Sequence, residues 1–399
     1  MGAAPYLIVC NAGSSSLKIE VFAGGESALR IAIAGIGRDR AELRVAGRSA
    51  VTIGAVADQR AAAQVLFDAL ASGSCGLAVV PGDVAATAHR VVHGGADFAE
   101  PIVMSDTVLR RLEALEDLAP LHNPAALAVA RSARERFPES AMVAVFDTAF
   151  FADLPEAARV YALPARWRRA RAIRRYGFHG IAHEYLYRRY RELVPAGRRP
   201  DRVVSLQLGQ GCSAAALLDG RPVETSMGYT PLEGLVMGTR GGDVDPGVLL
   251  ALARAGEPWD AIDAALQHES GLLGLSETSG DMREVLAREA AGEPGAGLAV
   301  AAFCHRAVKY VGAYAAVLGG LDAVLFGGGI GENAPAVRAR ICAGMAWLGL
   351  GVDERANAQL VGAEGSIAAR GSSIDAYVIA VREEVAIARA ARALLSLDA

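Results

Sequence analysis

Lysine is almost absent from this sequence. Of the 40 lysines and arginines among its 399 residues, only Lys18 and Lys309 are lysines. Such a bias toward arginine has the character of genome composition rather than of function. Because lysine is so rare, its presence at position 18, directly behind a serine-rich loop, weakly favours a function for that side chain.

Several familiar signatures are missing as well. The five cysteines are scattered without CxxC or CxxxH spacing, so the sequence predicts neither a disulfide framework nor a zinc site. Neither the Walker A motif GxxxxGK[ST] nor GxGxxG occurs, which excludes the P-loop and the Rossmann fingerprint. Residues 298–326 form the longest apolar region, but charged residues interrupt it and make it too polar to cross a bilayer. The N-terminus also lacks the basic start of a signal peptide, and we expect a cytoplasmic protein.

The remaining composition is that of a globular protein with more than one domain. Apolar residues make up 52% and charged residues 21% of the chain, far from the composition of disordered segments. At 399 residues the chain is longer than a single core usually supports, so two domains are expected. The net charge of −4 disfavours nucleic acids and anionic membranes as main partners.

The most informative segment is residues 6–22, YLIVCNAGSSSLKIEVF. An apolar run, a loop of small residues and a second run with alternating apolar positions predict two strands joined by a tight loop. The loop offers backbone N–H groups, three hydroxyls and an amide, and Gly13 allows a ligand to approach the backbone. The segment is therefore a candidate anion site. A serine-rich hairpin turn without a ligand explains the same pattern.

A second strand–loop–strand segment at residues 202–218, RVVSLQLGQGCSAAALL, suggests a duplicated architecture with one such hairpin in each domain. Strands and helices alternate along the rest of the chain and predict α/β layers. Residues 152–169 are expected to lead from the first domain to the second, and the last helix is expected to return to the first. Further strands are predicted at residues 91–92, 141–145, 323–326 and 376–380. Helices are predicted at residues 108–118, 123–137, 183–193, 259–269, 299–318, 334–344 and 383–395.

Polar residues suited to chemistry gather in short blocks. Five of the seven histidines lie in HRVVHGG, APLHNP and RRYGFHGIAH. Each of them is by itself more commonly a structural polar group than a catalyst, but active sites collect residues from separate loops at strand ends. Asp147 follows an apolar strand, where α/β proteins usually bind ligands and metals. Glu383 and Glu384 begin the last helix, where acidic residues also have the simpler role of favouring the helix dipole.

Arginines supply the candidate anion sites, because the guanidinium fork binds carboxylate or phosphate through two hydrogen bonds. Arg90 and Arg240 are the main candidates, and glycines flank Arg240 in MGTRGGDVDP. For Arg174 and Arg175 a solvated basic face is the preferred interpretation. The segment FGGGIGEN, residues 326–333, follows a strand and opens a helix, a place where a nucleotide can lie against the backbone.

Taken in order, these blocks resemble the acetate kinase family of short-chain carboxylate kinases, in the superfamily of actin, sugar kinases and heat-shock ATPases. The resemblance extends over nearly the whole chain and rests on CNAGSSSLK, HRVVHGG, APLHNP, FDTAF, RRYGFHG, ETSMGYTPLEGLVMGTRGGDVDP, SGDMR, FGGGIGENAP and EEVAIAR. It implies reversible transfer of the γ-phosphoryl group of ATP, the co-substrate, to acetate, with Mg²⁺ (or Mn²⁺), in a cytoplasmic homodimer. It also implies an α/β, two-domain actin-like ATPase fold, in which a ribonuclease H-like unit is duplicated about a central interdomain cleft. The first domain would comprise residues 1–151 and 383–399, and the nucleotide-binding second domain residues 152–382.

The resemblance further implies roles for individual residues. The catalytic residues would be Arg90 and Arg240, which hold the carboxylate and the transferring phosphoryl group, His179, which stabilises that phosphoryl group, and Asp147, which is associated with magnesium. The metal would be held by Asn11, Asp147 and Glu383. The substrate would contact Arg90, Val92, Leu121, Phe178 and Pro231. The nucleotide and its phosphates would contact Ser14, Ser16, Lys18, Gln207, Leu208, Gly209, Gln210, Gly211, Asp281, Met282, Arg283, Gly329, Ile330, Gly331 and Asn333.

The chain departs from the family pattern in the second phosphate loop, where relatives usually read His-Leu-Gly-Asn-Gly and this chain reads QLGQG at 207–211. Gln207 cannot become cationic and Gln210 is one methylene longer than asparagine, so we expect weaker phosphate-donor binding and slower turnover rather than none. The preferred acid stays open among acetate, propionate and butyrate, because one methylene is worth only about 1–3 kcal/mol of discrimination. Pyrophosphate is a less favoured donor, since the glycine loop leaves room for adenosine. A non-catalytic nucleotide-binding protein is the alternative from a different class.

Overall fold

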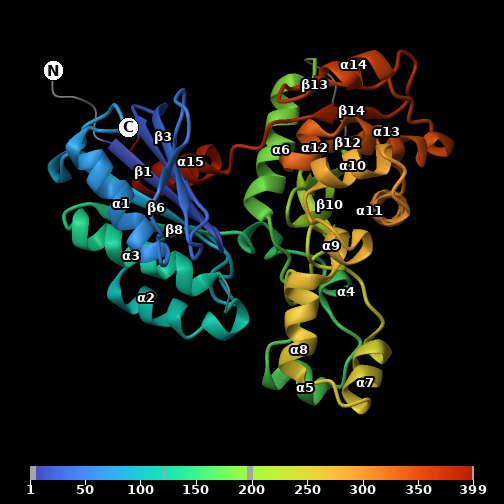
Figure 1. The fold of residues 1–399 in the computed structure, drawn as a ribbon, viewed down its shortest axis with the longest axis horizontal. Helices are drawn as coiled ribbons and strands as arrows, with labels where there is room; N and C mark the ends of the chain where they lie inside the picture. The colour runs from blue at the N-terminus through green and yellow to red at the C-terminus, as the bar shows by residue number, and fades with distance from the viewer. Residues whose placement is uncertain (1–5, 121, 196–200, 398–399) are drawn as a thin grey trace. The chain divides into compact units, whose positions relative to one another are not determined.

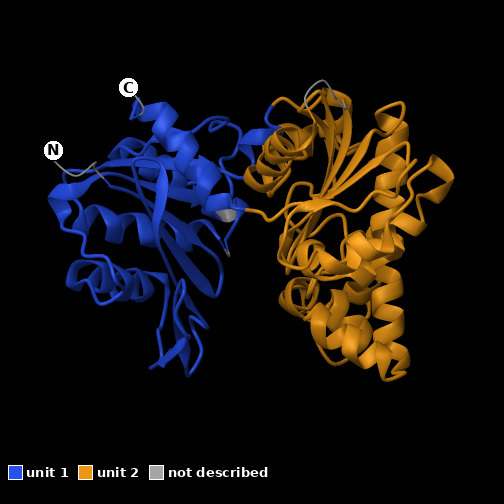
Figure 2. Cartoon of the chain, turned by 90° about the horizontal axis from the view of Figure 1, so that it is seen from above, with its two compact units in different colours: residues 1–152, 382–399 blue, residues 153–381 orange. Residues whose placement is uncertain are grey.

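In the computed structural model of the chain, which describes residues 6–120, 122–195 and 201–397, segment 6–22 forms the central strands of an eight-stranded sheet (Figure 1). Strands β1 (Tyr6–Ala12) and β2 (Ser16–Ala23) are antiparallel, and β1 pairs in parallel with β6 (Val84–Val91). This sheet belongs to unit 1, the described part of Met1–Ala152 and Arg382–Ala399. Unit 2 is the described part of Asp153–Val381 (Figure 2).

The sheet of unit 1 has the strand order β5-β4-β3-β2-β1-β6-β8-β7. Helices α1 and α3 contact one face of it, and the last helix of the chain, α15, contacts β1, β6 and β8 from the other. The remaining strands of unit 1 are β3 (Glu26–Ala34), β4 (Ala41–Val45), β5 (Val51–Ile53), β7 (Ile102–Val103) and β8 (Ala141–Phe146). Its helices are α1 (Gln59–Ser72), α2 (Asp106–Glu113), α3 (Asn123–Arg136) and α15 (Glu383–Leu395), with single 3₁₀ turns at Pro81–Asp83, Glu116–Leu118 and Ala149–Phe151.

Unit 2 contains a six-stranded sheet in the order β11-β10-β9-β12-β14-β13. Its strands are β9 (Arg202–Leu208), β10 (Cys212–Leu218), β11 (Arg221–Thr225), β12 (Ala323–Gly327), β13 (Gly365–Ser366) and β14 (Asp375–Val378). Its helices are α4 (Glu156–Arg159), α5 (Ala165–Ala170), α6 (Gly180–Leu193), α7 (Pro246–Arg254), α8 (Trp259–Ala264), α9 (Gly271–Ser276), α10 (Met282–Ala290), α11 (Pro294–Val317), α12 (Gly328–Asn333), α13 (Pro335–Ala343) and α14 (Glu354–Gln359), with a 3₁₀ turn at Ala346–Leu348. Helices α6 and α11 both contact the central strands of this sheet, from opposite sides (Figure 1).

The two sheets share one topology. In unit 1, β3, β2 and β1 are antiparallel neighbours, and β6 and β8 continue the sheet in parallel with β1. In unit 2, β11, β10 and β9 are antiparallel neighbours, and β12 and β14 continue in parallel with β9. The repeated order confirms the predicted duplication and the two-domain actin-like fold.

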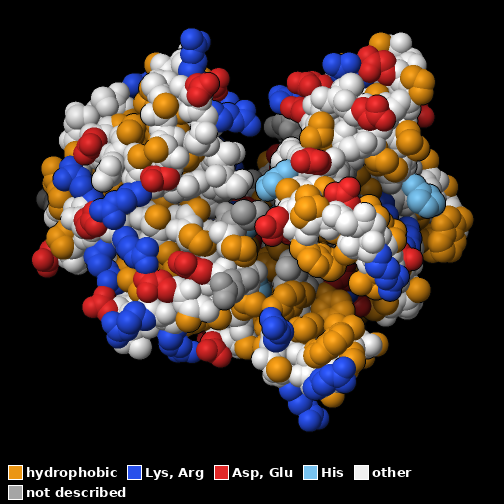
Figure 3. All heavy atoms as spheres, turned by 60° about the horizontal axis from the view of Figure 1, so that its bottom comes forward, with side chains coloured by type: hydrophobic (Ala, Val, Ile, Leu, Met, Phe, Trp, Pro, Cys, Tyr) orange, Lys and Arg blue, Asp and Glu red, His pale blue; other side chains and the backbone are white. Residues whose placement is uncertain are grey.

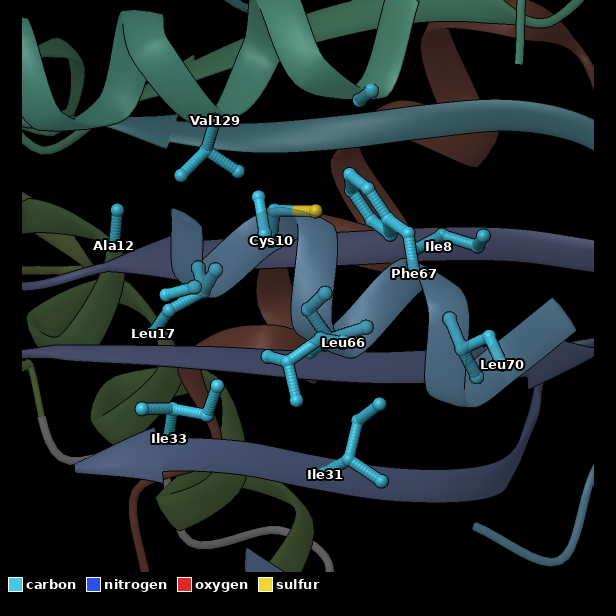
Figure 4. Close-up of a cluster of buried hydrophobic side chains, with 14 of the residues drawn as sticks. Ile8, Cys10, Ala12, Leu17, Ile31, Ile33, Leu66, Phe67, Leu70 and Val129 are labelled. Atoms are coloured by element: carbon cyan, nitrogen blue, oxygen red, sulfur yellow. The ribbon is translucent and has the colours of Figure 1, made fainter. Parts of the chain in front are cut away.

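Alternation along β1 explains how its two faces are used. Ile8, Cys10 and Ala12 point to one face and pack into a core with Phe67 from α1 and Val129 from α3 (Figure 4). In this core each fully buried side chain of the size of Ile8, Phe67 or Val129 stabilises the fold by about 1.5–3 kcal/mol relative to exposure. The residues between them point to the other face, which α15 covers, and this face includes Asn11.

Most predicted elements are confirmed, with several differences in detail. The strand predicted at residues 91–92 is β6, which ends at Val91, and the helix predicted at residues 108–118 is α2 followed by the 3₁₀ turn at Glu116–Leu118. The helix predicted at residues 259–269 is α8 followed directly by a π-helical segment, Ala265–Glu269. The segment predicted to lead from the first domain to the second contains the short helix α4 and most of α5. No helix in the described part of the chain is both long and apolar enough to cross a membrane.

Candidate active site

Three polar side chains lie where parallel strands of unit 1 end. Asn11 lies near the end of β1, Arg90 near the end of β6, and Asp147 directly after β8. Because these strands are parallel neighbours, their carboxyl ends meet at one edge of the sheet. Arg90 Nη2 donates to Asp147 Oδ2 at 2.5 Å and Arg90 Nη1 donates to Asn11 Oδ1 at 3.2 Å, so the three side chains form one hydrogen-bonded group.

The first turn of α15 brings two more carboxylates to this group. Asn11 Nδ2 donates to Glu383 Oε2 at 2.9 Å and to Glu384 Oε1 at 3.0 Å. Glu383 Oε2 also lies 4.0 Å from Arg90 Nε. Acidic side chains at a helix N-terminus are favoured by the dipole alone, but these two also have specific partners. Their contacts with Asn11 and Arg90 are therefore more than a favourable interaction with the helix dipole.

Negative charge exceeds positive charge in this group. Burial lowers the pKa of Arg90, but the carboxylates of Asp147 and Glu383 outweigh burial and hold that pKa above its ordinary value. Asp147 is fully buried. The other nearby cation is Lys18, which is largely exposed and whose Nζ lies 3.9 Å from Glu384 Oε1. Three carboxylates therefore face one buried and one exposed cation.

Such a set of oxygen ligands is suited to Mg²⁺. This ion usually keeps several waters and is held by one or two carboxylates together with substrate phosphates. Among the described residues no group of three His, Cys, Asp or Glu side chains is arranged to enclose an ion. Asn11, Asp147 and Glu383 fit an ion that the protein holds jointly with a bound phosphate.

The loop between β1 and β2 exposes its hydroxyls. Gln59 Nε2 from α1 donates to the carbonyls of Gly13 at 3.0 Å and Ser14 at 2.8 Å, which fixes the loop from behind. Ser14 is exposed and Ser16 is half-buried. The hydroxyl-bearing residues of this loop are therefore accessible to a ligand, as a candidate anion site requires.

In unit 2 the candidate residues gather around Gly211. A Cβ atom on this glycine would lie 2.7 Å from Arg240 Nη2 and 3.4 Å from His179 Nε2. Both side chains thus face one small space that the missing side chain leaves open. His179 is the N-cap residue of α6 and has left-handed backbone angles, φ 57° and ψ 26°. Such a conformation is uncommon for a residue with a side chain and often marks a functional position.

Arg240 is a largely buried cation without a carboxylate partner among the described residues. Its Nη1 donates to the backbone oxygen of Pro231 at 2.9 Å, and no Asp or Glu in this part of the chain forms an ion pair with it. Burial lowers the pKa of Arg240 from its ordinary value, because no described carboxylate compensates for the lost hydration. The guanidinium group keeps donors for an anion that would supply the missing charge.

The loop that follows β9, residues 209–211, lies against the glycine-rich segment that opens α12. Gly328 has φ 76°, and a Cβ atom there would lie 2.6 Å from the backbone oxygen of Leu208, so only glycine fits. A Cβ atom on Gly209 would lie 4.0 Å from the backbone nitrogen of Gly329. The loop after β9 and the start of α12 therefore form one continuous backbone surface, as a bound nucleotide would need.

The two glutamines that depart from the family pattern differ in environment. The Oε1 atom of Gln207 is buried and has no hydrogen-bond partner among the described residues. Gln210 is exposed, and its Nε2 lies 2.2 Å from the position that a Cβ atom on Gly238 would take. The longer side chain at 210 is therefore accommodated by a glycine opposite.

Residues predicted to contact adenosine lie on two further elements. Asn333 is exposed and its Nδ2 donates to the backbone oxygen of Gly329 at 2.9 Å. Asp281 is the N-cap of α10, and its hydrogen bonds to Arg283 lower the pKa of its carboxyl group. Met282 is buried in the core, so its side chain is not available to a ligand.

A family model described as the Acetokinase family matches residues 6–389. The chain belongs to the acetokinase family. An acetate kinase of Solibacter usitatus is 43% identical over 406 aligned residues, which cover 96% of this chain and 96% of that protein. The crystal structure of Porphyromonas gingivalis acetate kinase aligns with a TM-score of 0.90 at 34% identity, covering 98% of this chain and 100% of that one. A propionate kinase from Francisella tularensis aligns with a TM-score of 0.88, also at 34% identity, covering 97% of this chain and 98% of that one.

In this acetokinase the predicted site residues fall into one group in each unit. Asn11, Arg90, Asp147 and Glu383 are joined by hydrogen bonds and close charges in unit 1, while His179 and Arg240 face one space in unit 2. The residues predicted to contact the acyl group are divided in the same way. Val92 is buried in unit 1, and Phe178 and Pro231 lie in unit 2. Leu121 lies outside the described residues.

One interpretation of this acetokinase sequence is wrong. Arg174 and Arg175 do not form a solvated basic face. The side chain of Arg175 is only 17% exposed, and its Nη2 lies 2.6 Å from Glu233 Oε1. Its Nη1 donates to backbone oxygens of Thr225, Ser226 and Met227 and so supports the strand and loop that lead toward Pro231. The Arg174 guanidinium lies 4.7 Å from the centre of the Tyr176 ring.

Four further residues around the site had no role assigned from the sequence. His183, Ser205 and Ser213 hydrogen-bond in series behind His179, and Glu384 binds Asn11 beside Glu383. A local signal existed for the serines, because each stands alone in an apolar strand, but only the packed structure shows that both side chains meet the same helix.

Proposed function

We propose that this protein transfers the γ-phosphoryl group of ATP to acetate and forms acetyl phosphate and ADP in a reversible reaction. The observation that carries the proposal is Arg240, a buried guanidinium group with no carboxylate partner among the described residues, which shares its open side with His179. Membership of the acetokinase family supports the same reaction. The acetate and propionate kinases that the chain resembles differ in their acid, and acetate is the substrate proposed here.

The chemistry follows from the charges. A carboxylate is a competent nucleophile at neutral pH, so no general base is required, but an anion must attack a polyanion. We propose that Arg240 and His179 donate hydrogen bonds to the transferring phosphoryl group, and that Arg90, positioned by Asp147, orients the attacking carboxylate. Asn11, Asp147 and Glu383 would hold Mg²⁺, which when bound neutralises phosphate charge. These groups are preorganised in each unit, so little reorganisation is needed within either one.

A hydroxamate assay with ATP, Mg²⁺ and acetate, propionate or butyrate tests the reaction and ranks the acids. We expect acetyl hydroxamate from acetate, and an Arg240→Ala variant should lose on the order of 10²–10³ in kcat, as when one transition-state donor is removed. Arg221→Ala, which removes an exposed arginine of the same unit, is the control and should keep full activity. Full turnover by Arg240→Ala would contradict the proposal. No product from any acid would favour the non-catalytic nucleotide-binding protein.

We further propose that the protein is a homodimer that packs through an apolar face of unit 2. This face is defined by Leu163, Trp167, Val248, Leu250, Leu252 and Trp259. Helix α7 consists mostly of apolar residues yet buries none of them, and Trp259 at the start of α8 is 61% exposed. Figure 3 shows hydrophobic side chains gathered on this part of unit 2. An exposed apolar patch of this kind is typical of an interface between subunits.

The dimer is tested by substituting one large residue of this face. Trp259→Glu should convert the protein from dimer to monomer in size-exclusion chromatography with light scattering, because a charge would be buried at the interface. Trp347→Glu is the matched control, since Trp347 is 73% exposed and lies outside the face. A dimer that persists in Trp259→Glu would refute this choice of interface.

A cytoplasmic location is also proposed, supported by five cysteines that are all free.

A further inference from the structure

A chain of hydrogen bonds runs through the interior of unit 2 and ends at His179. Ser205 Oγ lies 2.8 Å from His183 Nδ1, and His183 Nε2 lies 2.8 Å from Ser213 Oγ. Ser213 Oγ in turn lies 2.9 Å from His179 Nδ1. The four groups are therefore connected in one line from strand β9 to the N-terminus of α6.

Strand register and helix periodicity place these residues together. In the β9–β10 pair, Ser205 is opposite Ala215 and Ser213 is opposite Gln207, so both hydroxyls point to the same face of the sheet. Helix α6 lies on that face. His179 and His183 are four residues apart and lie one above the other on the helix, which sets His183 between the two serines.

The three inner residues of this hydrogen-bond series have no access to water. Ser205, Ser213 and His183 each have no exposed surface. Burial lowers the pKa of His183 to about 3, with a smaller contribution from neighbouring His179, so His183 is neutral at physiological pH. A neutral imidazole carries its proton on one nitrogen and accepts a hydrogen bond at the other, so only one tautomer can be present at a time.

The hydrogen bond from Ser205 determines the tautomer of His183. Among the described residues its hydroxyl has one side-chain partner, His183 Nδ1. If Nδ1 carried the proton, the hydrogen of the buried Ser205 hydroxyl would have no acceptor, and an unsatisfied buried donor is costly. Ser205 therefore donates to His183 Nδ1, and the proton of His183 is on Nε2.

The same assignment of donors and acceptors can be continued along the hydrogen-bond series to His179. His183 Nε2–H donates to Ser213 Oγ, so the single hydroxyl proton of Ser213 is directed to His179 Nδ1. Nδ1 must then be an acceptor, which excludes both the Nδ1–H tautomer and the doubly protonated imidazolium. From this geometry we infer that the Ser205–His183–Ser213 chain holds His179 as a neutral imidazole whose Nε2–H points toward the space beside Gly211.

This inference rests on the proposed function for its use, since the donor at Nε2 serves a phosphoryl group only if one is transferred there. His179 would then offer a hydrogen bond without becoming a second cation beside Arg240. Among the described contacts of His179, the titratable neighbours are Arg240, which lines the same space beside Gly211, and His183. Ser205, His183 and Ser213 are positioning residues, because none of them faces the open space itself.

The proton positions can be read directly by long-range ¹H–¹⁵N correlation spectra of the full-length protein labelled with ¹⁵N-histidine. Signals of His179 and His183 are assigned from their disappearance in His179→Gln and His183→Gln. We expect both rings to be neutral Nε2–H tautomers from pH 6.5 to pH 9, with pyridine-like Nδ1 shifts. A wild-type protein whose His179 is an Nδ1–H tautomer or an imidazolium in this range would overturn the inference.

Isosteric pairs of variants test the hydroxyls separately from packing. Ser213→Thr and Ser213→Val add the same extra bulk, but only threonine keeps the hydroxyl. We expect Ser213→Val to have a kcat about 10–100-fold below that of Ser213→Thr, with KM values within roughly threefold of each other, and to lose the uniform His179 tautomer. Ser205→Thr and Ser205→Val should differ in the same direction. Equal kcat and equal ¹⁵N spectra within both pairs would refute the role of the chain.

The tautomer measurement needs no activity, so the two proposals fail separately. Acetate kinase activity with a different His179 tautomer would support the proposed function and refute the inferred role of the Ser205–His183–Ser213 series. The expected tautomer without activity would support the chain and reject the proposed function.

Discussion

Two arginines that the sequence predicts as a pair have opposite surroundings. Arg90 is hydrogen-bonded to Asp147 and Asn11, and the carboxylates of Asp147 and Glu383 raise its pKa, whereas burial lowers the pKa of Arg240 and no described carboxylate compensates. Charge that is already paired orients a ligand, while unpaired buried charge attracts one. The asymmetry supports the proposed division of tasks, in which Arg90 would position the acid and Arg240 would receive the phosphoryl group.

Gln207 is a second residue whose surroundings predict its effect. Its Oε1 atom is buried without a partner, so the side chain is poorly satisfied where relatives usually carry histidine. Gln207→His would restore a group that can donate to phosphate as a cation, and charge-assisted hydrogen bonds are about twice as strong as neutral ones. We expect the KM for ATP to fall about tenfold in Gln207→His, measured with saturating acetate.

The control for that comparison is Gln207→Asn, which keeps an uncharged amide and should therefore not lower the KM for ATP. Identical kinetics for all three proteins would show that position 207 makes no contact with the phosphate donor.

At the scale of elements, the glycine-rich start of α12 depends on a single buried side chain. Arg338 of α13 has no exposed surface and donates to the backbone oxygens of Gly331, Glu332, Asn357 and Leu360 at 2.7–3.0 Å. Burial lowers the pKa of Arg338 to about 10, so the side chain stays charged at neutral pH. This arginine joins the end of α12 to the segment around α14 and thereby shapes the predicted adenosine site.

Arg338→Leu should therefore lower the free energy of unfolding by about 3 kcal/mol, because several buried carbonyls lose their donor at once. Urea denaturation measures this loss, and the KM for ATP should rise as α12 loosens. Arg340→Leu on the same helix is the matched control. Its ion pair with Glu289 is partly exposed to solvent, so its removal should cost less than about 1 kcal/mol. Equal losses in the two variants would contradict the structural role of Arg338.

Sequence patterns predicted the elements well because the signals are local. Apolar alternation predicts β1 and β2, and glycines after an apolar run predict the start of α12. The interpretation of Arg175 failed because its acidic partners, Glu224 and Glu233, lie far along the chain, and neighbouring arginines made a solvated face the simpler reading. Ser205 and Ser213 carry no local sign that one helix packs on both. Contacts that cross between elements are the part that a linear pattern does not contain.

At the scale of the whole molecule, each unit contains a buried neutral histidine. His89 in unit 1 is 1% exposed, its Nε2 lies 3.1 Å from Thr87 Oγ1, and burial lowers its pKa to about 3. His183 has the same property in unit 2. In the unfolded chain both side chains would titrate near 6.5. Between these values the unfolded state binds more protons than the folded state, so acid favours unfolding.

The expected dependence of stability on pH follows from this difference in proton binding between the folded and unfolded states. Each histidine contributes its full stabilisation above pH 6.5, and the contribution falls as the pH drops toward 3, with a limiting slope of about 1.4 kcal/mol per pH unit. All three tryptophans, Trp167, Trp259 and Trp347, lie in unit 2, so urea unfolding followed by tryptophan fluorescence reports on that unit. We expect the unfolding free energy of unit 2 to be constant from pH 7 to pH 8 and to decline below pH 6.5.

Comparison with two variants separates the histidines. His183→Gln should be less stable than the wild type at pH 7 but should lose stability less steeply below pH 6.5, because its side chain has no proton to gain on unfolding. A variant with the wild-type slope would show that His183 is not the group responsible. His89→Gln should leave the fluorescence-detected slope unchanged if the two units unfold independently. If it lowers the slope as well, the units unfold together, and the free energy measured through the tryptophans belongs to the whole chain.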